Sequence, residues 1–370
     1  MLCSAGVGAD RAGLTTRARL RSIPRMSAPV DPRHGMDVLR WTSSPRGHVE
    51  SFFLKANDPR APERALWLKW TVLAPVGRPG DAVAELWAIR FDGAGGAHHA
   101  AKTTAAASAC QLARDRLALE VAGAELGPGY ARGGAGEGAA RITWSLEFDY
   151  DDQRPMFGFP HLWMYEGGFP KGKLYTSCPQ TRVTGTIERG GERWRVDGWP
   201  GMLGHNWGAA HNPRYHWAQC SLFDDGADAV FEGYSGKIRL GPALSPWLTG
   251  AVVRHAGRTL RFHALRRLLN RSVRVDARDG RWSWSFRARA REPDGAWRLD
   301  WRVAAPREDL VGLRYVNPDG SLNHCLNSKI ATCELELTRG RERVARLRGT
   351  RSCAYEILTQ DFDHGVAVLA

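Results

Sequence analysis

The chain has 370 residues; 43% of them are hydrophobic, 25% are charged and 15 are tryptophan. This composition supplies enough apolar surface for a large core, so it excludes a chain that is disordered throughout. No run approaches the roughly 20 consecutive apolar residues that a membrane-spanning helix requires. The length predicts two domains, which we place at residues 36–188 and 189–370, after a leader at residues 1–35.

The net charge of +13 would by itself suggest a nucleic-acid or anionic-membrane partner. Two segments hold the whole excess: residues 1–35 carry six Arg against two Asp, and residues 251–305 carry 14 Arg against five acids. Only seven of the 52 basic residues are Lys, a skew that a GC-rich genome produces without selection for binding. We therefore expect no nucleic-acid partner.

The seven cysteines are scattered and odd in number, and no CxxC occurs. This pattern predicts reduced, partly buried thiols in a cytoplasmic protein rather than a disulfide framework. Residues 1–35 lack the apolar stretch of a secretory signal, and their Gly, Ala, Ser, Arg and Pro content predicts a disordered leader. Translation from Met26 or Met36 is the alternative to such a leader.

Strand-like alternation of apolar and polar residues dominates residues 36–188. Residues 104–115 are an exception, because their Ala-rich pattern predicts a short helix. Residues 151–173 are rich in Pro and Gly and predict a domain junction or a loop over a ligand mouth. Strands are predicted at 65–74, where Leu66, Leu68, Trp70 and Val72 share one face, and at 83–91, 140–150 and 181–188.

The second half of the chain continues the pattern, and its clearest strand pair is 281–290 with 296–303. Glu-Pro-Asp-Gly at 292–295 predicts the turn of a hairpin with one aromatic face and one arginine face. A nucleic-acid surface would instead place stacking aromatics beside the arginines. Other strands are predicted at 192–199, 214–223, 228–236, 248–255 and 259–264, with a helical turn at 264–271.

The most unusual segment is 197–225, which gathers three histidines and three tryptophans among glycines. Glycine allows backbone geometry that other residues resist, so we expect a glycine-framed turn around the His-Asn-Trp core. Such residues suit an apolar pocket with a few placed polar groups. The glycines are Gly201, Gly204 and Gly208, the histidines are His205, His211 and His216, and the tryptophans are Trp199, Trp207 and Trp217.

The three histidines allow three interpretations. A metal site is disfavoured, because their spacing matches no metal motif and no carboxylate lies among them. Structural roles are favoured for His211 and His216, and a functional role is favoured for His205. The chain has neither GxGxxG nor a P-loop, so we expect neither a metal nor an organic cofactor.

Three motifs resemble a known group of proteins: GHNWG at 204–208, YHWAQCSLF at 215–223 and FEGYSG at 231–236. They are similar to motifs of the carotenoid 1,2-hydratases (hydroxyneurosporene synthases) and of the tocopherol cyclases, over roughly residues 190–360. The resemblance implies an all-β fold of two tandem lipocalin-like (calycin-type) antiparallel β-barrels. The second domain, 189–370, is expected to carry the HNWG motif.

The resemblance also implies chemistry on an isoprenoid double bond. An acid protonates the alkene, and water or an internal hydroxyl traps the cation, which requires a raised pKa, aromatic faces and exclusion of stray water. We therefore expect a cofactor-independent hydratase or cyclase for a hydrophobic small molecule, in the cytoplasm, with peripheral membrane contact left open. The alternative is a non-catalytic, lipocalin-like carrier of an apolar ligand.

Carried onto this chain, the resemblance makes His205 and Trp207 catalytic. No Asp stands at the acid position of the hydratases, and we favour Glu232 as the acid because Phe231 and Gly233 flank it. Alternation along the strand places Glu232 and Tyr234 on one face, so both are expected to point into the cavity. Asp224 and Asp225 suit a turn better than a site, Asp228 remains an alternative, and the expected substrate-binding residues are Asn206, Trp199, Trp217, Tyr234 and Tyr215.

A second polar cluster lies at 313–329. A functional interpretation puts Asn323 or His324 at the mouth of the barrel. A hydrogen-bonded loop is the favoured alternative.

Overall fold

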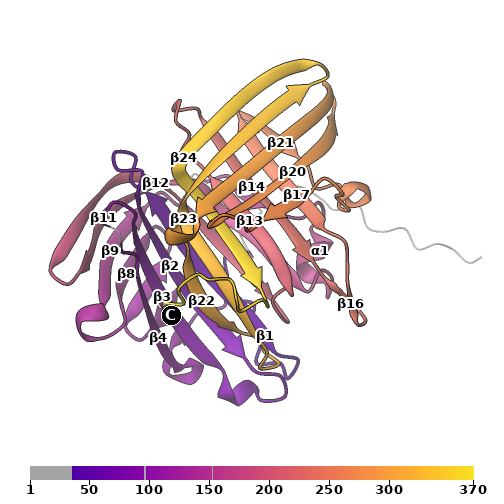
Figure 1. Ribbon diagram of the computed structural model, residues 1–370. Coiled ribbons are helices and arrows are strands. Elements are labelled where there is room, and N and C mark those ends of the chain that lie inside the picture. Colours follow the sequence, from indigo (N-terminus) through magenta and orange to yellow (C-terminus); the bar gives the residue numbers. More distant parts are fainter. Residues whose placement is uncertain (1–35, 96, 152) are drawn as a thin grey trace, which may run out of the picture.

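The computed structural model describes residues 36–95, 97–151 and 153–370. Within these ranges the chain is nearly all β-strand, and its two large antiparallel sheets curl into half-barrels (Figure 1). The predicted all-β fold with two tandem curled sheets is confirmed. The leader expected at residues 1–35 lies outside the described residues.

The first sheet has 12 strands in the order β4-β3-β2-β1-β12-β11-β9-β8-β7-β6-β5, with β10 paired to β11. Three short 3-10 turns, η1 (Pro79–Asp81), η2 (Ala107–Ala109) and η3 (Gly138–Ala140), and the helix α1 (Trp163–Glu166) connect its strands. The strands are β1 (His48–Asn57), β2 (Arg64–Ala74), β3 (Val83–Asp92), β4 (His99–Ala106), β5 (Gln111–Leu112), β6 (Leu119–Val121), β7 (Ala124–Gly127), β8 (Tyr130–Ala135), β9 (Ile142–Phe148), β10 (Met156–Phe157), β11 (Gly172–Arg189) and β12 (Glu192–Gly208).

The second sheet has ten strands in the order β18-β17-β14-β13-β24-β23-β21-β20-β19, with β22 paired to β23. A small hairpin of β15 (Arg239–Leu240) and β16 (Ala243–Leu244) stands apart from it, and two 3-10 turns, η4 (Leu265–Arg267) and η5 (Arg307–Asp309), interrupt the connections. The strands are β13 (Arg214–Cys220), β14 (Ala229–Lys237), β17 (Leu248–His255), β18 (Arg258–Arg261), β19 (Arg274–Asp276), β20 (Arg281–Glu292), β21 (Gly295–Pro306), β22 (Val311–Val316), β23 (Leu322–Arg339) and β24 (Glu342–Thr359).

The first and last strands of each sheet are neighbours: β1 pairs with β12, and β13 pairs with β24. The chain therefore passes from one sheet to the other between Gly208 and Arg214, later than the boundary at 188/189 that we expected. That boundary falls at the turn of the long β11–β12 hairpin, which pairs Arg189 with Glu192. Consequently the HNWG motif belongs to the first sheet and not to the second.

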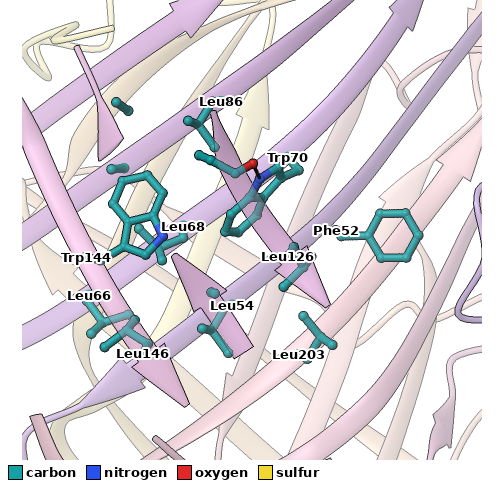
Figure 2. Close-up of a cluster of buried hydrophobic side chains, with 14 of the residues drawn as sticks. Phe52, Leu54, Leu66, Leu68, Trp70, Leu86, Leu126, Trp144, Leu146 and Leu203 are labelled. Carbon is teal, nitrogen blue, oxygen red and sulfur yellow. Dashed lines mark hydrogen bonds between the residues drawn. The ribbon is translucent and has the colours of Figure 1, made fainter. Parts of the chain in front are cut away.

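The core of the first sheet is built from one face of β2 and its neighbours (Figure 2). Leu66, Leu68, Trp70 and Val72 are all buried there, which confirms the face predicted from their alternation. The Trp70 indole donates its N–H to the carbonyl oxygen of Ala124 at 3.2 Å, so this buried polar atom is satisfied.

The predicted 292–295 hairpin supplies much of the second core. Its register pairs Glu292 with Gly295, and Trp284, Phe286, Trp297 and Trp301 are buried. The opposite face carries the arginines in solvent, as predicted.

Two local predictions have different outcomes. The helix predicted at 104–115 is wrong: Ala106 ends β4, and η2 and β5 follow. Pairing of β4 with β3 overrides the helix propensity of the alanines. The helical turn predicted at 264–271 is present as η4. Residues 151–173 connect β9 to β11 within the first sheet and so are not a domain junction.

The two sheets pack against each other through their outer faces. Phe53 and Trp67 of the first sheet meet Trp217 and Tyr315 of the second in one buried cluster. Hydrogen bonds cross this interface, including one from Asn57 Nδ2 to the Lys329 carbonyl oxygen at 2.6 Å and one from Gln219 Nε2 to that of Pro179 at 2.9 Å. Strands β1 and β2 are consequently buried on both faces.

Cysteine chemistry follows the prediction. In the described ranges, Cys110, Cys220, Cys325, Cys333 and Cys353 are free thiols, and all of these except Cys110 are buried, as is Cys178.

Candidate functional site

A cavity of about 160 Å³ lies between the two sheets. Strands β1, β2 and β12 form one wall, β13, β14 and β24 form the opposite wall, and residues of the 151–173 loop lie along the side. Most of the lining is apolar or aromatic with a few polar groups, which is typical of a ligand pocket. The aromatic wall includes Trp67, Trp207, Tyr215, Trp217, Tyr234 and Tyr315.

The strand register sets the order of side chains on the second-sheet wall. Trp217 on β13 is directly opposite Glu356 on β24 and Tyr234 on β14, so these three form one row. Side chains opposed in this way lie within contact distance on the same face. Tyr215 lies two residues from Trp217 on the same face and also lines the cavity. Three of the expected substrate-binding residues thus lie in the cavity wall.

Glu232 is buried, with 4% of its surface exposed. The Thr176 hydroxyl lies 2.8 and 2.9 Å from its two carboxyl oxygens, and the Trp217 indole N–H donates to Oε1 at 3.1 Å. Burial raises the pKa of Glu232 to about 7, although both hydrogen-bonding partners act in the opposite direction. A carboxyl group with that pKa is partly protonated near neutrality.

Glu232 and Tyr234 share one face of β14, as expected, but that face points away from the barrel interior into which it was expected to point. Phe231 stacks on Trp301 at 3.5 Å between ring centroids in the second core, which turns Glu232 and Tyr234 to the outer face. Only Tyr234 reaches the cavity surface, because the carboxyl of Glu232 lies behind Trp217. The cavity is therefore between the half-barrels, whereas a barrel interior had been expected.

His205, which was expected to be catalytic, lies outside the cavity lining and contacts Glu50 and Met36. Its Nε2 is 2.8 Å from Glu50 Oε1 and its Nδ1 is 2.6 Å from the Met36 carbonyl oxygen. The ring is stacked between Phe52 and Trp207, with centroids 3.9 and 4.4 Å away. It is fully buried and does not line the cavity, whereas its neighbours Asn206 and Trp207 do.

Glu50 is the centre of this structural network. It also accepts hydrogen bonds from the backbone N–H groups of Arg40 and Trp41 and lies 2.7 Å from His48 Nε2. Burial alone would raise the pKa of Glu50, but the bonds from His205 and His48 outweigh it and lower the pKa to about 2. The network ties the start of the described chain to β1 and β12.

The remaining predicted residues divide between cavity and core. Trp207 and Asn206 line the cavity, and the Trp207 ring also lies 5.4 Å from the Arg40 guanidinium. Trp199 was expected to bind substrate, but it is buried in the first core, 6.4 Å from Trp194. The prediction for Trp199 is corrected because residues on this strand alternate between core and interface.

We had expected the glycines of the HNWG segment to frame a turn. They do not, because the motif forms the end of strand β12. They are needed for close packing instead. A Cβ at Gly204 would lie 2.4 Å from the Phe53 ring, and one at Gly208 would lie 2.0 Å from the Lys171 carbonyl oxygen. Both distances are shorter than a van der Waals contact, so a Cβ at Gly204 would displace the ends of the Phe53 and Met202 side chains, and one at Gly208 would displace the backbone at Lys171.

The sequence interpretation missed a charged group on the cavity wall. Lys69 and Glu356 line the cavity, and Glu356 is 2.8 Å from the Nζ of fully buried Lys329. The Lys69 ammonium lies 3.9 Å from the Tyr315 ring centroid, and burial lowers the pKa of Lys69. The signal was present: Lys69 stands inside an apolar strand of a chain with few lysines.

Of the three histidines, His211 lines the cavity. Burial, with the positive charge of Lys69 adding to it, lowers the pKa of His211 to about 3, so its ring is neutral near pH 7. His216 lies in the second core with Nδ1 3.0 Å from the Tyr355 hydroxyl, and burial lowers the pKa of His216 to about 3. Structural roles had been favoured for both histidines. His216 lies in the core, whereas His211 lines the cavity.

The polar cluster at 313–329 contributes strand β23 rather than a loop. Asn323 is fully buried, and His324 Nδ1 lies 2.8 Å from His364 Nε2. Neither residue lines the cavity. Asp224 and Asp225 lie in a turn, as predicted.

Comparison with known proteins finds a family model that is similar to part of this chain. The family model described as tocopherol cyclase-like matches residues 176–357. Over these residues, just under half of its length, the chain is similar to the tocopherol cyclase-like family. The tocopherol cyclase-like region begins at Thr176 and includes Trp217, Glu232 and Glu356, so it contains the whole second-sheet wall of the cavity and leaves Lys69 outside.

Other comparisons cover more of this chain, and one of them, a Nitrosomonas europaea structure, supports the fold. An uncharacterized protein of Mycobacterium tuberculosis is 25% identical over 328 residues, which is 85% of this chain and 88% of that protein. The crystal structure of a protein from Nitrosomonas europaea assigned as AttH covers 90% of this chain and 99% of its own, with 15% identity and a TM-score of 0.52. Kievitone hydratase from Nectria haematococca covers 86% and 90%, with 10% identity and a TM-score of 0.44.

In the described part of the chain, no helix is both long and apolar enough to cross a membrane.

Proposed function

We propose that this chain is a cofactor-independent hydratase or cyclase that protonates an alkene of a hydrophobic, isoprenoid-type substrate in the cavity between the sheets. Two forms are a carotenoid 1,2-hydratase-like hydro-lyase and a tocopherol cyclase-like intramolecular cyclase. The family match supports chemistry of the hydratase or cyclase type. The observation that carries the proposal is a buried carboxyl group, Glu232, with a pKa raised to about 7 beside an aromatic cavity.

Glu232 is the acid in this proposal. A group with a pKa near the working pH both holds a proton and can release it, which is the condition for general-acid catalysis. Trp217 fixes Oε1 by its N–H bond, which leaves Oε2, beside the Thr176 hydroxyl, to carry the proton. Because Glu232 lies behind Trp217, the indole must shift for the acid to reach a double bond in the cavity.

Proton transfer forms a bond to one alkene carbon and leaves a cation on the other. The faces of Trp67, Trp217 and Tyr234 stabilise that charge, since a desolvated cation–π contact contributes about 2 kcal/mol. The apolar wall also excludes bulk water, so that the cation survives until the intended nucleophile attacks.

Glu356 completes the reaction as a base. Glu356 lies on the cavity surface and pairs with Lys329, and there it can accept the proton released when water or a substrate hydroxyl attacks the cation. Two carboxyl groups in different environments thereby take opposite roles, one as acid and one as base. Return of the proton to Glu232 closes the cycle. His205 has no part in it, because both of its nitrogens are engaged.

The test is mass spectrometry of lipids and pigments from cells that express the wild-type chain, Glu232→Gln, or neither. A product heavier by one water indicates hydration, and an isomer of unchanged mass indicates cyclisation. The Glu232→Gln variant keeps an acceptor for Trp217 but has no acidic proton, so we expect the product to disappear. Product formation equal to wild type would refute Glu232 as the acid.

A non-catalytic carrier of an apolar ligand is the second candidate. It is favoured by one observation, the position of Glu232 behind Trp217, because a carrier needs no access to an acid. Unaltered lipids and pigments, together with recovery of an intact hydrophobe bound to the purified protein, would support it.

We also propose that the protein acts in the cytoplasm, with peripheral contact to a membrane that holds the substrate.

A further inference from the structure

Three surface segments around the cavity expose large apolar side chains. The segments are 162–169 around α1, 239–244 in the β15–β16 hairpin, and 265–269 at η4. They contain seven of the 14 exposed large hydrophobic residues of the described chain. The most exposed are Leu269 at 64%, Leu240 at 56%, Phe169 at 53% and Trp163 at 52%. We call these three segments the mouth rim.

The three segments surround one opening. Met164 and Phe169 of the first segment line the cavity, and so do Ile238, beside the hairpin, and Leu268 of the third segment. Figure 1 shows α1 and β16 on the same side of the molecule. The exposed apolar residues therefore form the entrance of the cavity and are not scattered over the surface.

The mouth rim is also strongly basic. Residues 233–275 contain nine Lys or Arg and no Asp or Glu. Arg239, Arg266, Arg267 and Arg271 are exposed within the rim or next to it. Glu166 is the one acid among residues 153–173. Three of the 14 arginines in residues 251–305, Arg266, Arg267 and Arg271, thus lie in the rim or next to it.

Apolar side chains exposed in one place mark an interaction site, because monomeric proteins seldom leave such patches in water. Leucine and tryptophan enter the boundary between lipid headgroups and acyl chains, and arginines beside them bind anionic headgroups. The combination fits a lipid surface better than an acidic protein, which would require few exposed leucines. We propose that the mouth rim docks on an anionic lipid bilayer and opens the cavity toward the acyl chains.

Docking would let a hydrophobic substrate pass from the bilayer into the cavity without crossing water. This role rests on the proposed function, whereas the docking itself does not. The two are therefore tested separately.

Co-sedimentation of the full chain with vesicles tests the docking. The vesicles contain phosphatidylcholine alone or with about 30% phosphatidylserine, which supplies the negative surface potential. We expect binding to the anionic vesicles only, with binding weakened by added salt. Absence of binding to the anionic vesicles, or equal binding to both kinds, would overturn the proposal.

Two variants locate the surface. Each arginine near an anionic membrane strengthens binding about fivefold, so reversing two charges in Arg266→Glu/Arg267→Glu should weaken it by about 25-fold or more. Leu265→Ser/Leu269→Ser removes two apolar side chains and should weaken it by about tenfold or more. The matched control is Val344→Ser/Arg343→Glu/Arg346→Glu on the exposed β23–β24 hairpin, which makes the same kinds of change away from the rim.

A soluble apolar fluorophore that quenches the cavity tryptophans reports folding and pocket integrity in every variant. Loss of vesicle binding in both rim variants, with fluorophore uptake and control binding retained, supports the proposal. Equal loss in the control, or a dimer in sedimentation velocity whose interface covers the rim, overturns it. If cells show no product while these results hold, the proposed function fails and the docking surface stands.

Discussion

Replacement of Glu232 by Gln should make the protein more stable above neutral pH. The folded pKa of Glu232 is about 7 against an ordinary 4.5, a rise of about 2.5 units, and each unit corresponds to 1.36 kcal/mol. The folded state therefore keeps a proton that the unfolded state has lost between pH 4.5 and 7. The stabilisation that protonated Glu232 gives the folded state is fully present below pH 4.5 and is lost as the pH rises through 7. The free energy of unfolding falls by about 3 kcal/mol over this range.

Glutamine is neutral at every pH, retains an oxygen to accept the Trp217 N–H, and can donate to the Thr176 hydroxyl. The difference in unfolding free energy between Glu232→Gln and wild type should therefore grow from near zero at pH 4.5 to about 3 kcal/mol at pH 8. Urea denaturation of both proteins at several pH values measures it, since groups common to both cancel.

Glu147→Gln on β9 is the matched control, because Glu147 is exposed and makes one long contact of 3.6 Å with Arg132. We expect no pH-dependent difference for this variant. A flat difference for Glu232→Gln across pH 4.5–8 would refute the assignment of a raised pKa, and with it the main support for Glu232 as an acid.

Three further substitutions test the structural assignments. His205→Ala leaves buried Glu50 without one of its partners and should cost about 3–5 kcal/mol in urea denaturation, whereas a surface-like effect would contradict the structural role. Glu356→Gln should cost a similar amount because it removes the ion-pair partner of buried Lys329, and Lys329→Met added to it should recover most of the loss; no recovery would show that the pair is not coupled. Gly208→Ala places a Cβ against the Lys171 carbonyl oxygen and should lower stability by about 1–3 kcal/mol; an unchanged thermal midpoint would argue against this close packing.

Period-two alternation recovered the parts of the fold that depend on one strand at a time. It gave the core face of β2, the 292–295 hairpin and the shared face of Glu232 and Tyr234. It could not give strand pairing, which depends on contacts far apart in sequence. This is why the boundary was placed inside the β11–β12 hairpin and Trp199 was assigned to a pocket when it packs in a core.

The candidate site was recovered in part for the same reason. Trp217, Tyr234 and Tyr215 come from adjacent strands of one motif-rich region, so a local reading found them. Lys69 and Glu356 lie in different halves of the chain and meet only because the sheets pack through their outer faces. A single sequence contains no direct sign of that packing.

An indirect sign was nevertheless present in β2. An edge or solvated strand alternates apolar and polar residues, but ALWLKWTVLA is apolar on both faces, and its single charge is Lys69. Two apolar faces require two cores, and the second core here is the interface between the sheets. A lysine on such a face must be either paired or directed into a cavity, because burial of an isolated ammonium is too costly. Read this way, the strand itself predicts a polar pocket between two β layers, and the structure has Lys69 lining that pocket beside Tyr315.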